Sequence, residues 1–249
     1  MTNDDVRPPT QNRREQRLAL GIVFGAIGAA VLASVFVALS PPVSVQREAS
    51  ARAVTPEAHR ADLTIDVEAA VASAREAAER ADIVATEAQA LITRARAGLS
   101  RSPTFARLKL PDGRVYEGEA SAGVPEGVGV LRGGAVAYGV GFFVGGVRSG
   151  AGADCAQPDC SGASYFGDFR TNAPTGAARV TFPDGAVYRG DVRNGAPDGF
   201  GELRRPDGSR YAGAFTMGRR DGHGVETPAS GAAQSGYWSG DQLSEGLPS

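Results

Sequence analysis

The stretch FPDGAVYRGDVRNGAPDGFGEL, residues 182–203, decides the fold because its aromatic residues and glycines recur at a fixed interval. Tyr188 is repeated 23 residues later as Tyr211, and Gly190 is repeated as Gly213. A short, constant period of this kind predicts a repeat architecture in which each unit packs on its neighbours. The glycines are therefore expected to serve architecture before chemistry.

The same spacing continues towards the N-terminus and the C-terminus. A complete copy begins at Tyr116, and an incomplete copy begins at Tyr165. Between them lies a degenerate unit in which Gly139 takes the tyrosine position, and a truncated unit begins near Tyr237. The residues that define the repeats are Tyr116, Gly118, Gly123, Gly127, Gly129, Tyr165, Gly167, Tyr188, Gly190, Gly195, Gly199, Gly201, Tyr211, Gly213, Gly218, Gly222 and Gly224.

Each unit has the pattern of a β-hairpin. A Pro-Asp-Gly turn at 183–185 precedes the alternating apolar residues of a strand at 186–188. Glycine weakens a strand unless backbones must approach closely or bend, so its regular use predicts close packing. One hairpin cannot bury a face alone, and stacked hairpins share a core. We expect that core to contain Tyr188, Phe200, Tyr211 and Phe215.

The pattern Y-x-G-x-x-x-x-G-x-x-x-G-x-G, followed by Asp-Gly, resembles the MORN repeat family over residues 109–241. The resemblance implies a mainly β fold, an elongated antiparallel sheet or solenoid of about five to six units. It also implies scaffolding, membrane apposition or dimerisation, and in some members the binding of phospholipid head groups. This chain departs from a lipid-binding array because its arginines alternate with aspartates.

A long helical stalk is predicted over residues 55–98. Thr55 is a capping residue and Pro56 suits the first helical position, while Gly98 suits the end of the helix. Apolar residues between these limits alternate by four and three, which is typical of a coiled-coil seam. The seam is rich in alanine, so a solitary helix and a homo-oligomeric coiled coil both stay open. Its members are Leu63, Val67, Ala70, Ala74, Ala77, Ala81, Val84, Ala88, Leu91 and Ala95.

Residues 18–39 carry no charge and are long enough to span a bilayer as a helix. Three arginines at positions 13–17 precede them, which predicts a cytoplasmic tail at 1–17 and an outward-facing remainder after a linker at 40–54. A cleaved signal peptide is the alternative, but its apolar core would be shorter. One lysine against 25 arginines is typical of a GC-rich bacterial genome. We therefore expect a single-pass protein of the bacterial inner membrane whose C-terminal region is periplasmic.

Small residues recur every four positions within this apolar segment. Such a face permits close helix–helix contact and dimerisation. The segment is so rich in glycine and alanine that chance spacing is the competing interpretation. The residues concerned are Gly21, Gly25, Ala29 and Ala33.

Two cysteines, Cys155 and Cys160, lie in an insertion that lengthens one repeat. Their proximity in a turn-rich loop predicts a local disulfide in an oxidising compartment. Reduced thiols are an alternative. A metal site needs about four ligands, and neither histidine is near in sequence.

The functional expectation is an interaction protein without a cofactor or a metal. The net charge of −2 without a basic stripe argues against nucleic-acid binding, and no catalytic motif is found, so no enzyme is expected. We expect a membrane-anchored scaffold that docks a protein partner, with residues 242–249 as a tail. The alternative is a module for anionic head groups or peptidoglycan, contacted by Tyr237, Trp238, Arg204 and Arg205, although the two aromatic residues suit core packing as well.

Overall fold

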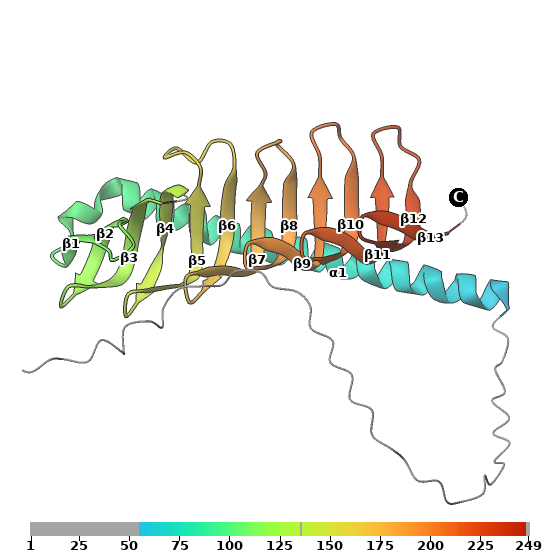
Figure 1. Cartoon of the computed structure of the whole chain (residues 1–249), viewed down its shortest axis with the longest axis horizontal. Helices are drawn as coiled ribbons and strands as arrows, with labels where there is room; N and C mark the ends of the chain where they lie inside the picture. The colour runs from blue at the N-terminus through green and yellow to red at the C-terminus, as the bar shows by residue number, and fades with distance from the viewer. Residues whose placement is uncertain (1–54, 135, 248–249) are drawn as a thin grey trace, which may run out of the picture. The chain divides into compact units, whose positions relative to one another are not determined.

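The computed structural model describes residues 55–134 and 136–247, which form one long helix and thirteen strands (Figure 1). The helix α1 (Pro56–Gly98) is followed by the short 3-10 turn η1 (Leu99–Arg101). The strands are β1 (Phe105–Lys109), β2 (Val115–Ser121), β3 (Val124–Gly133), β4 (Val136–Val144), β5 (Val147–Cys155), β6 (Ser164–Arg170), β7 (Ala173–Thr181), β8 (Val187–Arg193), β9 (Ala196–Arg204), β10 (Arg210–Thr216), β11 (Arg219–Thr227), β12 (Gln234–Ser239) and β13 (Gln242–Gly246).

The strands form a single open antiparallel sheet whose order follows the sequence from β1 to β13. Each hairpin therefore lies beside the previous one, as Figure 1 shows. The turn between β8 and β9 consists of Asn194 and Gly195, whose φ values are 51° and 81°. Two positive φ values are the requirement of a type I′ hairpin, which explains this Asn-Gly pair. The prediction of a mainly β antiparallel fold with a helix before it is confirmed.

Glycines on paired strands make room for the tyrosine rings. Gly190 lies opposite Gly201, and a Cβ on Gly190 would lie 2.5 Å from the Cα of Gly201. A Cβ on Gly201 would lie 2.4 Å from the hydroxyl oxygen of Tyr188, whose side chain is fully buried. The Tyr188 hydroxyl donates to the carbonyl of Asp191 at 2.7 Å, next to a bulge in strand β8. The glycine spacing is thus required for each strand to bend around its own tyrosine.

The tyrosines of successive units form an aromatic core on one face of the sheet. Their rings meet phenylalanine or tryptophan rings edge to face, which is a favoured aromatic geometry. Phe200, which the sequence predicts in this core, is only half-buried. The ring pairs and their centroid distances are Tyr116–Phe143 at 5.0 Å, Tyr165–Phe169 at 5.1 Å, Tyr188–Phe215 at 5.1 Å and Tyr211–Trp238 at 5.5 Å.

An arginine replaces the tyrosine in the degenerate unit. A Cβ on Gly141 would lie 2.5 Å from Cδ of Arg148, whose side chain crosses the space that a ring fills elsewhere. Arg148 is 3 % exposed, and its guanidinium bonds both oxygens of Asp154 at 2.7 and 2.9 Å. The same group lies 3.5 Å from the centroid of the Phe169 ring. A buried charge is tolerated here because it is paired and packed on an aromatic face.

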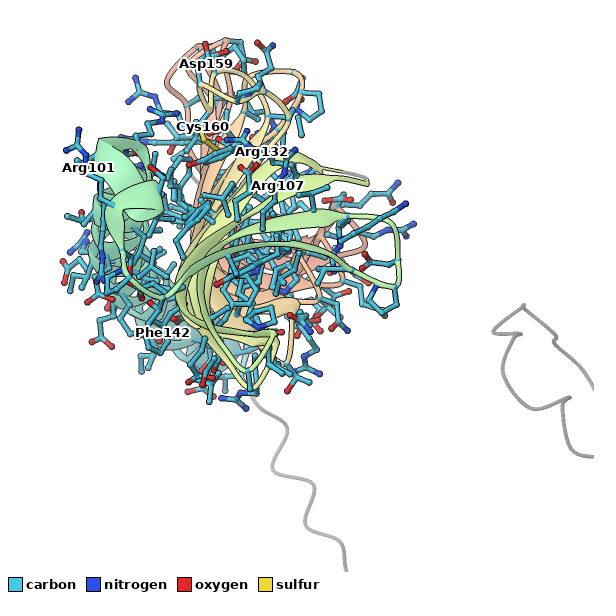
Figure 2. All side chains as sticks on the ribbon, turned by 90° about the vertical axis from the view of Figure 1, so that its left-hand side faces the viewer. Arg101, Arg107, Arg132, Phe142, Asp159 and Cys160 are labelled. Atoms are coloured by element: carbon cyan, nitrogen blue, oxygen red, sulfur yellow. A yellow bond between two sulfur atoms is a disulfide. The ribbon has the colours of Figure 1, made fainter. Side chains whose placement is uncertain are left out.

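Helix α1 lies along the face of the sheet opposite the repeat-defining tyrosines and contacts every strand from β3 to β12 (Figures 1 and 2). The prediction of a helical stalk that projects away from the repeats is therefore wrong, because the helix packs on the sheet. The buried positions follow about 3.6 residues per turn, the period of a straight helix, and not the 3.5 of a coiled coil. Ala85 and Ile92 are accordingly buried in place of the predicted Val84 and Leu91. The buried residues are Leu63, Val67, Ala70, Ala74, Ala77, Ala78, Ala81, Ala85, Ala88 and Ile92.

No helix within residues 55–134 and 136–247 is both long and apolar enough to cross a membrane. The predicted transmembrane segment at 18–39 lies outside the described residues. The same holds for its small-residue face, Gly21, Gly25, Ala29 and Ala33. The membrane anchor stays a prediction from the sequence.

Candidate functional site

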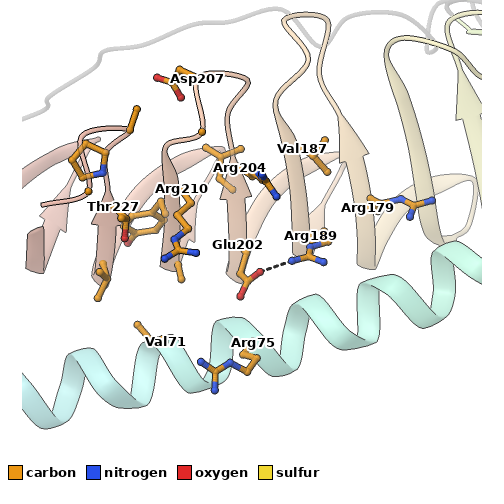
Figure 3. Close-up of a pocket in the computed structure, with 18 of the residues that line it drawn as sticks. Val71, Arg75, Arg179, Val187, Arg189, Glu202, Arg204, Asp207, Arg210 and Thr227 are labelled. Carbon is orange, nitrogen blue, oxygen red and sulfur yellow. Dashed lines mark hydrogen bonds and ion pairs between the residues drawn. The ribbon is translucent and has the colours of Figure 1, made fainter. Parts of the chain in front are cut away.

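A cleft of about 950 Å³ lies between helix α1 and strands β7 to β11 (Figure 3). Val71 and Arg75 line it from the helix, and residues of the sheet line the opposite wall. Alanines such as Ala74 and Ala77 are fully buried and hold the helix close to the strands. The strands continue past the helix towards the turn at Asp207, so the cleft opens on that side in Figure 3. The small alanine side chains thus bring the helix close to the sheet, and the long side chains beside this contact line the cleft.

Five arginines line the cleft, against three acidic residues. Arg189 is fully paired, because its guanidinium contacts Asp82 of the helix at 3.0 Å and Glu202 of strand β9 at 2.6 Å. Asp207 at the rim is held by Ser209, whose hydroxyl and N–H donate to it and lower the pKa of its carboxyl group. The other four arginines form no ion pair with any described residue. They are Arg75, Arg179, Arg204 and Arg210.

The register of the sheet places these arginines directly opposite one another. Arg179 lies opposite Arg189 on strands β7 and β8, and Arg204 lies opposite Arg210 on β9 and β10. Like charges at directly opposed positions destabilise a sheet. Arg179 is partly compensated because its guanidinium lies 5.5 Å from the Phe166 ring. The pair Arg204 and Arg210 has no comparable compensation among the described residues, so it leaves unbalanced positive charge in the cleft.

Apolar side chains alternate with the arginines in the lining. Val71 contributes from the helix, and Val187 and Val225 contribute from the sheet. A lining of this kind suits a ligand that combines negative charges with aliphatic groups. No cluster of histidine, cysteine or acidic residues within the described part of the chain has the composition of a metal site. The cleft can therefore bind and orient a ligand, and its charged hydrogen-bond donors are the guanidinium groups.

The four residues predicted as ligand contacts do not form one site in the structure. Arg204 lines the cleft, whereas Arg205 is paired with Glu226 at 2.7 Å. Trp238 is a core residue and not a surface contact, because it is 3 % exposed and its indole N–H donates to the carbonyl of Gly224. Its neighbour Tyr237 points to the other side of the strand and is 38 % exposed. Alternation along a strand forbids both aromatic rings from lining one surface.

The two cysteines are joined by a disulfide. Cys155 is fully buried in a cluster that includes Ile92 of the helix and Tyr138. The loop that the disulfide closes also accepts a hydrogen bond, since the Arg96 guanidinium donates to the carbonyl of Pro158 at 2.8 Å. The loop thus fastens the C-terminal part of α1, whereas the cleft-lining residues Val71 and Arg75 lie nearer the start of the helix.

Arg75, Arg179 and Arg210 were not predicted as ligand contacts. The register offers a signal for the sheet residues, because a hairpin closed by a Pro-Asp-Gly turn places Arg204 opposite Arg210. No such signal exists for Arg75, since its position depends on where the helix packs. The repeat-defining tyrosines lie in the aromatic core, and the repeat-defining glycines lie on the paired strands or in hairpin turns such as Asn194-Gly195. Of these residues only Tyr211 also borders the cleft.

The comparisons with known proteins agree with the repeat architecture over part of the chain. The family model of the MORN repeat matches residues 116–134, 188–210 and 211–232, which cover most of the hairpins β2–β3, β8–β9 and β10–β11. None of the curated proteins matches the chain. The arginines at 189, 204 and 210 lie within the second matched repeat. The chain therefore carries MORN repeats at three places between residues 116 and 232.

Proposed function

We propose that this protein is a membrane-anchored scaffold that presents its repeat sheet to a protein partner on the outer side of the bacterial inner membrane. MORN repeats suggest a scaffold or binding role. The apolar segment at 18–39 supports an anchor, and a disulfide between Cys155 and Cys160 suits an oxidising compartment.

The observation that carries the proposal is the helix that runs across ten consecutive strands, from β3 to β12. In a repeat array each unit contacts only its neighbours, so an array alone bends easily over its length. A helix packed across the units opposes such bending and makes one rigid body of them. Ion pairs between Arg80 and Asp191 at 3.0 Å, and between Arg94 and Glu119 at 2.7 Å, join the helix to the sheet at two further points. Rigid display of a large surface is a property of a platform for binding.

The proposal is tested on full-length protein in its own membranes. Washing the membranes with alkaline carbonate should leave the chain in the pellet, because an integral helix is not extracted by this treatment. A photo-reactive residue at Phe142, exposed on strand β4, or at Met217, exposed in the turn between β10 and β11, should then form a crosslink to one specific envelope protein. The variant Tyr188→Ala, which removes a fully buried ring from the repeat core, should lose that crosslink. Complete extraction by carbonate, or the absence of any crosslink in the intact protein, would contradict the proposal.

A further inference from the structure

The arginines of the cleft, of which only Arg189 is paired, form a row that faces the helix. Arg179, Arg189, Arg204 and Arg210 come from four successive strands, which are spaced about 4.8 Å apart in any sheet. Arg75 adds a fifth guanidinium from α1 (Figure 3). The row therefore runs across the strands, along the direction of the helix. Its positive charges are balanced only at Arg189 within the described structure.

The shape and lining of the cleft define the ligand that fits it. The helix walls one side, so a flat membrane surface has no access to its floor. Glu202 and Asp82 on the lining repel a uniformly anionic polymer, whereas Val71 and Val187 offer contacts for aliphatic side chains. A polypeptide segment that carries both carboxylates and aliphatic side chains meets all of these conditions. Guanidinium groups bind carboxylates in a two-pronged geometry, which fits the fork of each arginine to one acidic side chain.

We propose that the cleft between α1 and strands β7 to β11 binds an extended acidic segment of the partner protein, with Arg75, Arg204 and Arg210 as its carboxylate-binding residues. This inference rests on the proposed scaffold function and names the docking element of the partner. Recognition proceeds through side chains, because strands β7 to β11 lie inside the sheet and are paired on both sides. Strand addition at an edge is therefore not the mode of binding at this site.

The binding test uses full-length protein in a mild detergent and a short fluorescein-labelled peptide of alternating glutamate and leucine. Fluorescence anisotropy should report binding that weakens as salt is added, since charge pairs at a partly open site are screened. The double variant Arg204→Gln/Arg210→Gln should bind about tenfold more weakly or worse, because two charge-assisted contacts are lost. The control Arg101→Gln/Arg170→Gln removes two exposed arginines outside the cleft and should bind as the wild type does.

A variant with reversed charge also tests the proposal in case the glutamine substitutions change the structure of the cleft. The variant Arg204→Glu/Arg210→Glu should release the glutamate–leucine peptide and bind a peptide of alternating lysine and leucine. Equal affinity of the wild type and the Gln variant for the acidic peptide would overturn the proposal. So would binding of glycerol phosphate or inorganic phosphate by the cleft in the absence of peptide binding, since that result assigns the site to a phosphate or a lipid head group.

The same variants separate this inference from the scaffold function. If Arg204→Gln/Arg210→Gln loses the membrane crosslink at Met217 while carbonate still leaves the chain in the pellet, the cleft is the docking site. If the double variant keeps the crosslink, the scaffold function stands and the cleft proposal fails. If the wild type forms no crosslink but binds the acidic peptide through these arginines, the scaffold function fails while the cleft assignment holds.

Discussion

Helix α1 divides at Ile83 into two unequal halves, residues 56–82 and residues 83–98, which are held against the sheet by different forces. The C-terminal half contributes Ala85, Ala88 and Ile92 to a cluster with Val128 and other apolar residues of the sheet. The N-terminal half buries Leu63, Val67 and several alanines, which bury little area each, and it carries the exposed charged pairs of Arg80 and Asp82. The cleft lies beside this second half. Strong packing at one end thus permits an open, charged site at the other end without loss of the docked position.

The largest expected loss of stability comes from a substitution in the C-terminal half of α1. Ile92→Ala removes most of a side chain that is 1 % exposed and leaves a cavity, so it should lower the free energy of unfolding by about 3 kcal/mol. Ile83→Ala changes the same residue type one helical face away, where it is 61 % exposed, and should change that free energy by less than about 0.5 kcal/mol. Urea unfolding followed by circular dichroism measures both. Equal losses in the two variants would show that the helix does not pack on this face.

Removal of the disulfide should give the second-largest loss in the free energy of unfolding. Cys155→Ala/Cys160→Ala opens a loop with a sequence separation of 5, and loop-closure entropy predicts a loss of about 2 kcal/mol. The loss should be accompanied by faster hydrogen exchange near Arg96, because the Pro158 carbonyl that binds Arg96 is in that loop. A matched measurement is the exchange at Arg80, which should be unchanged. Faster exchange along the whole helix would show that the two halves are not independent.

The polar contacts of the N-terminal half should contribute less. Arg80→Ala removes an ion pair whose arginine side chain is 52 % exposed, so the free energy of unfolding should fall by at most about 0.5 kcal/mol. High salt should abolish the difference between this variant and the wild type, since an exposed pair is screened. Ala81→Gly is a useful contrast, because it perturbs the neighbouring buried position and should cost about 1 kcal/mol at any salt concentration. A salt-independent effect of Arg80→Ala would contradict the electrostatic account.

The smallest effect concerns pH at the first turns of the helix. His59 contacts the carboxylate of Glu245 in strand β13, and this hydrogen bond, with the charge of Glu245, raises the pKa of the imidazole. A raised pKa in the folded state means that the pair stabilises the protein below the ordinary histidine pKa of about 6.5, and that this contribution disappears as pH rises through the folded-state value. Hydrogen exchange at residues 59–63 should therefore accelerate from about pH 5 to pH 8 beyond the intrinsic chemical increase.

The variant His59→Gln is the control for this pH dependence. It keeps a polar side chain and cannot titrate, so the additional acceleration should vanish. Its persistence would show that another group causes the pH dependence, and it would contradict the role of the His59–Glu245 pair.

The sequence predicts the elements of this fold well because their signals are local. The Tyr-x-Gly spacing at 188–190 specifies a hairpin, and Thr55 and Gly98 bracket the helix whose observed bounds are Pro56–Gly98. The packing of that helix could not be predicted, because an alanine face serves a second helix and a sheet equally well. The arginine cleft was missed for the same reason: its walls meet only after the helix has docked. Arg204 alone was identified in advance, by its charge and not by its surroundings.

The most direct test of the docked helix is a zero-length crosslink within the chain. Lys109 is the only lysine, so Arg80→Lys/Arg94→Lys introduces amines at two positions that face carboxylates. Treatment with a water-soluble carbodiimide and peptide mapping should find links between positions 80 and 191 and between positions 94 and 119 in the monomeric protein, because these pairs lie 3.0 and 2.7 Å apart. If neither link forms, or if the links join two chains, the helix is a free or self-associating stalk and the cleft does not exist.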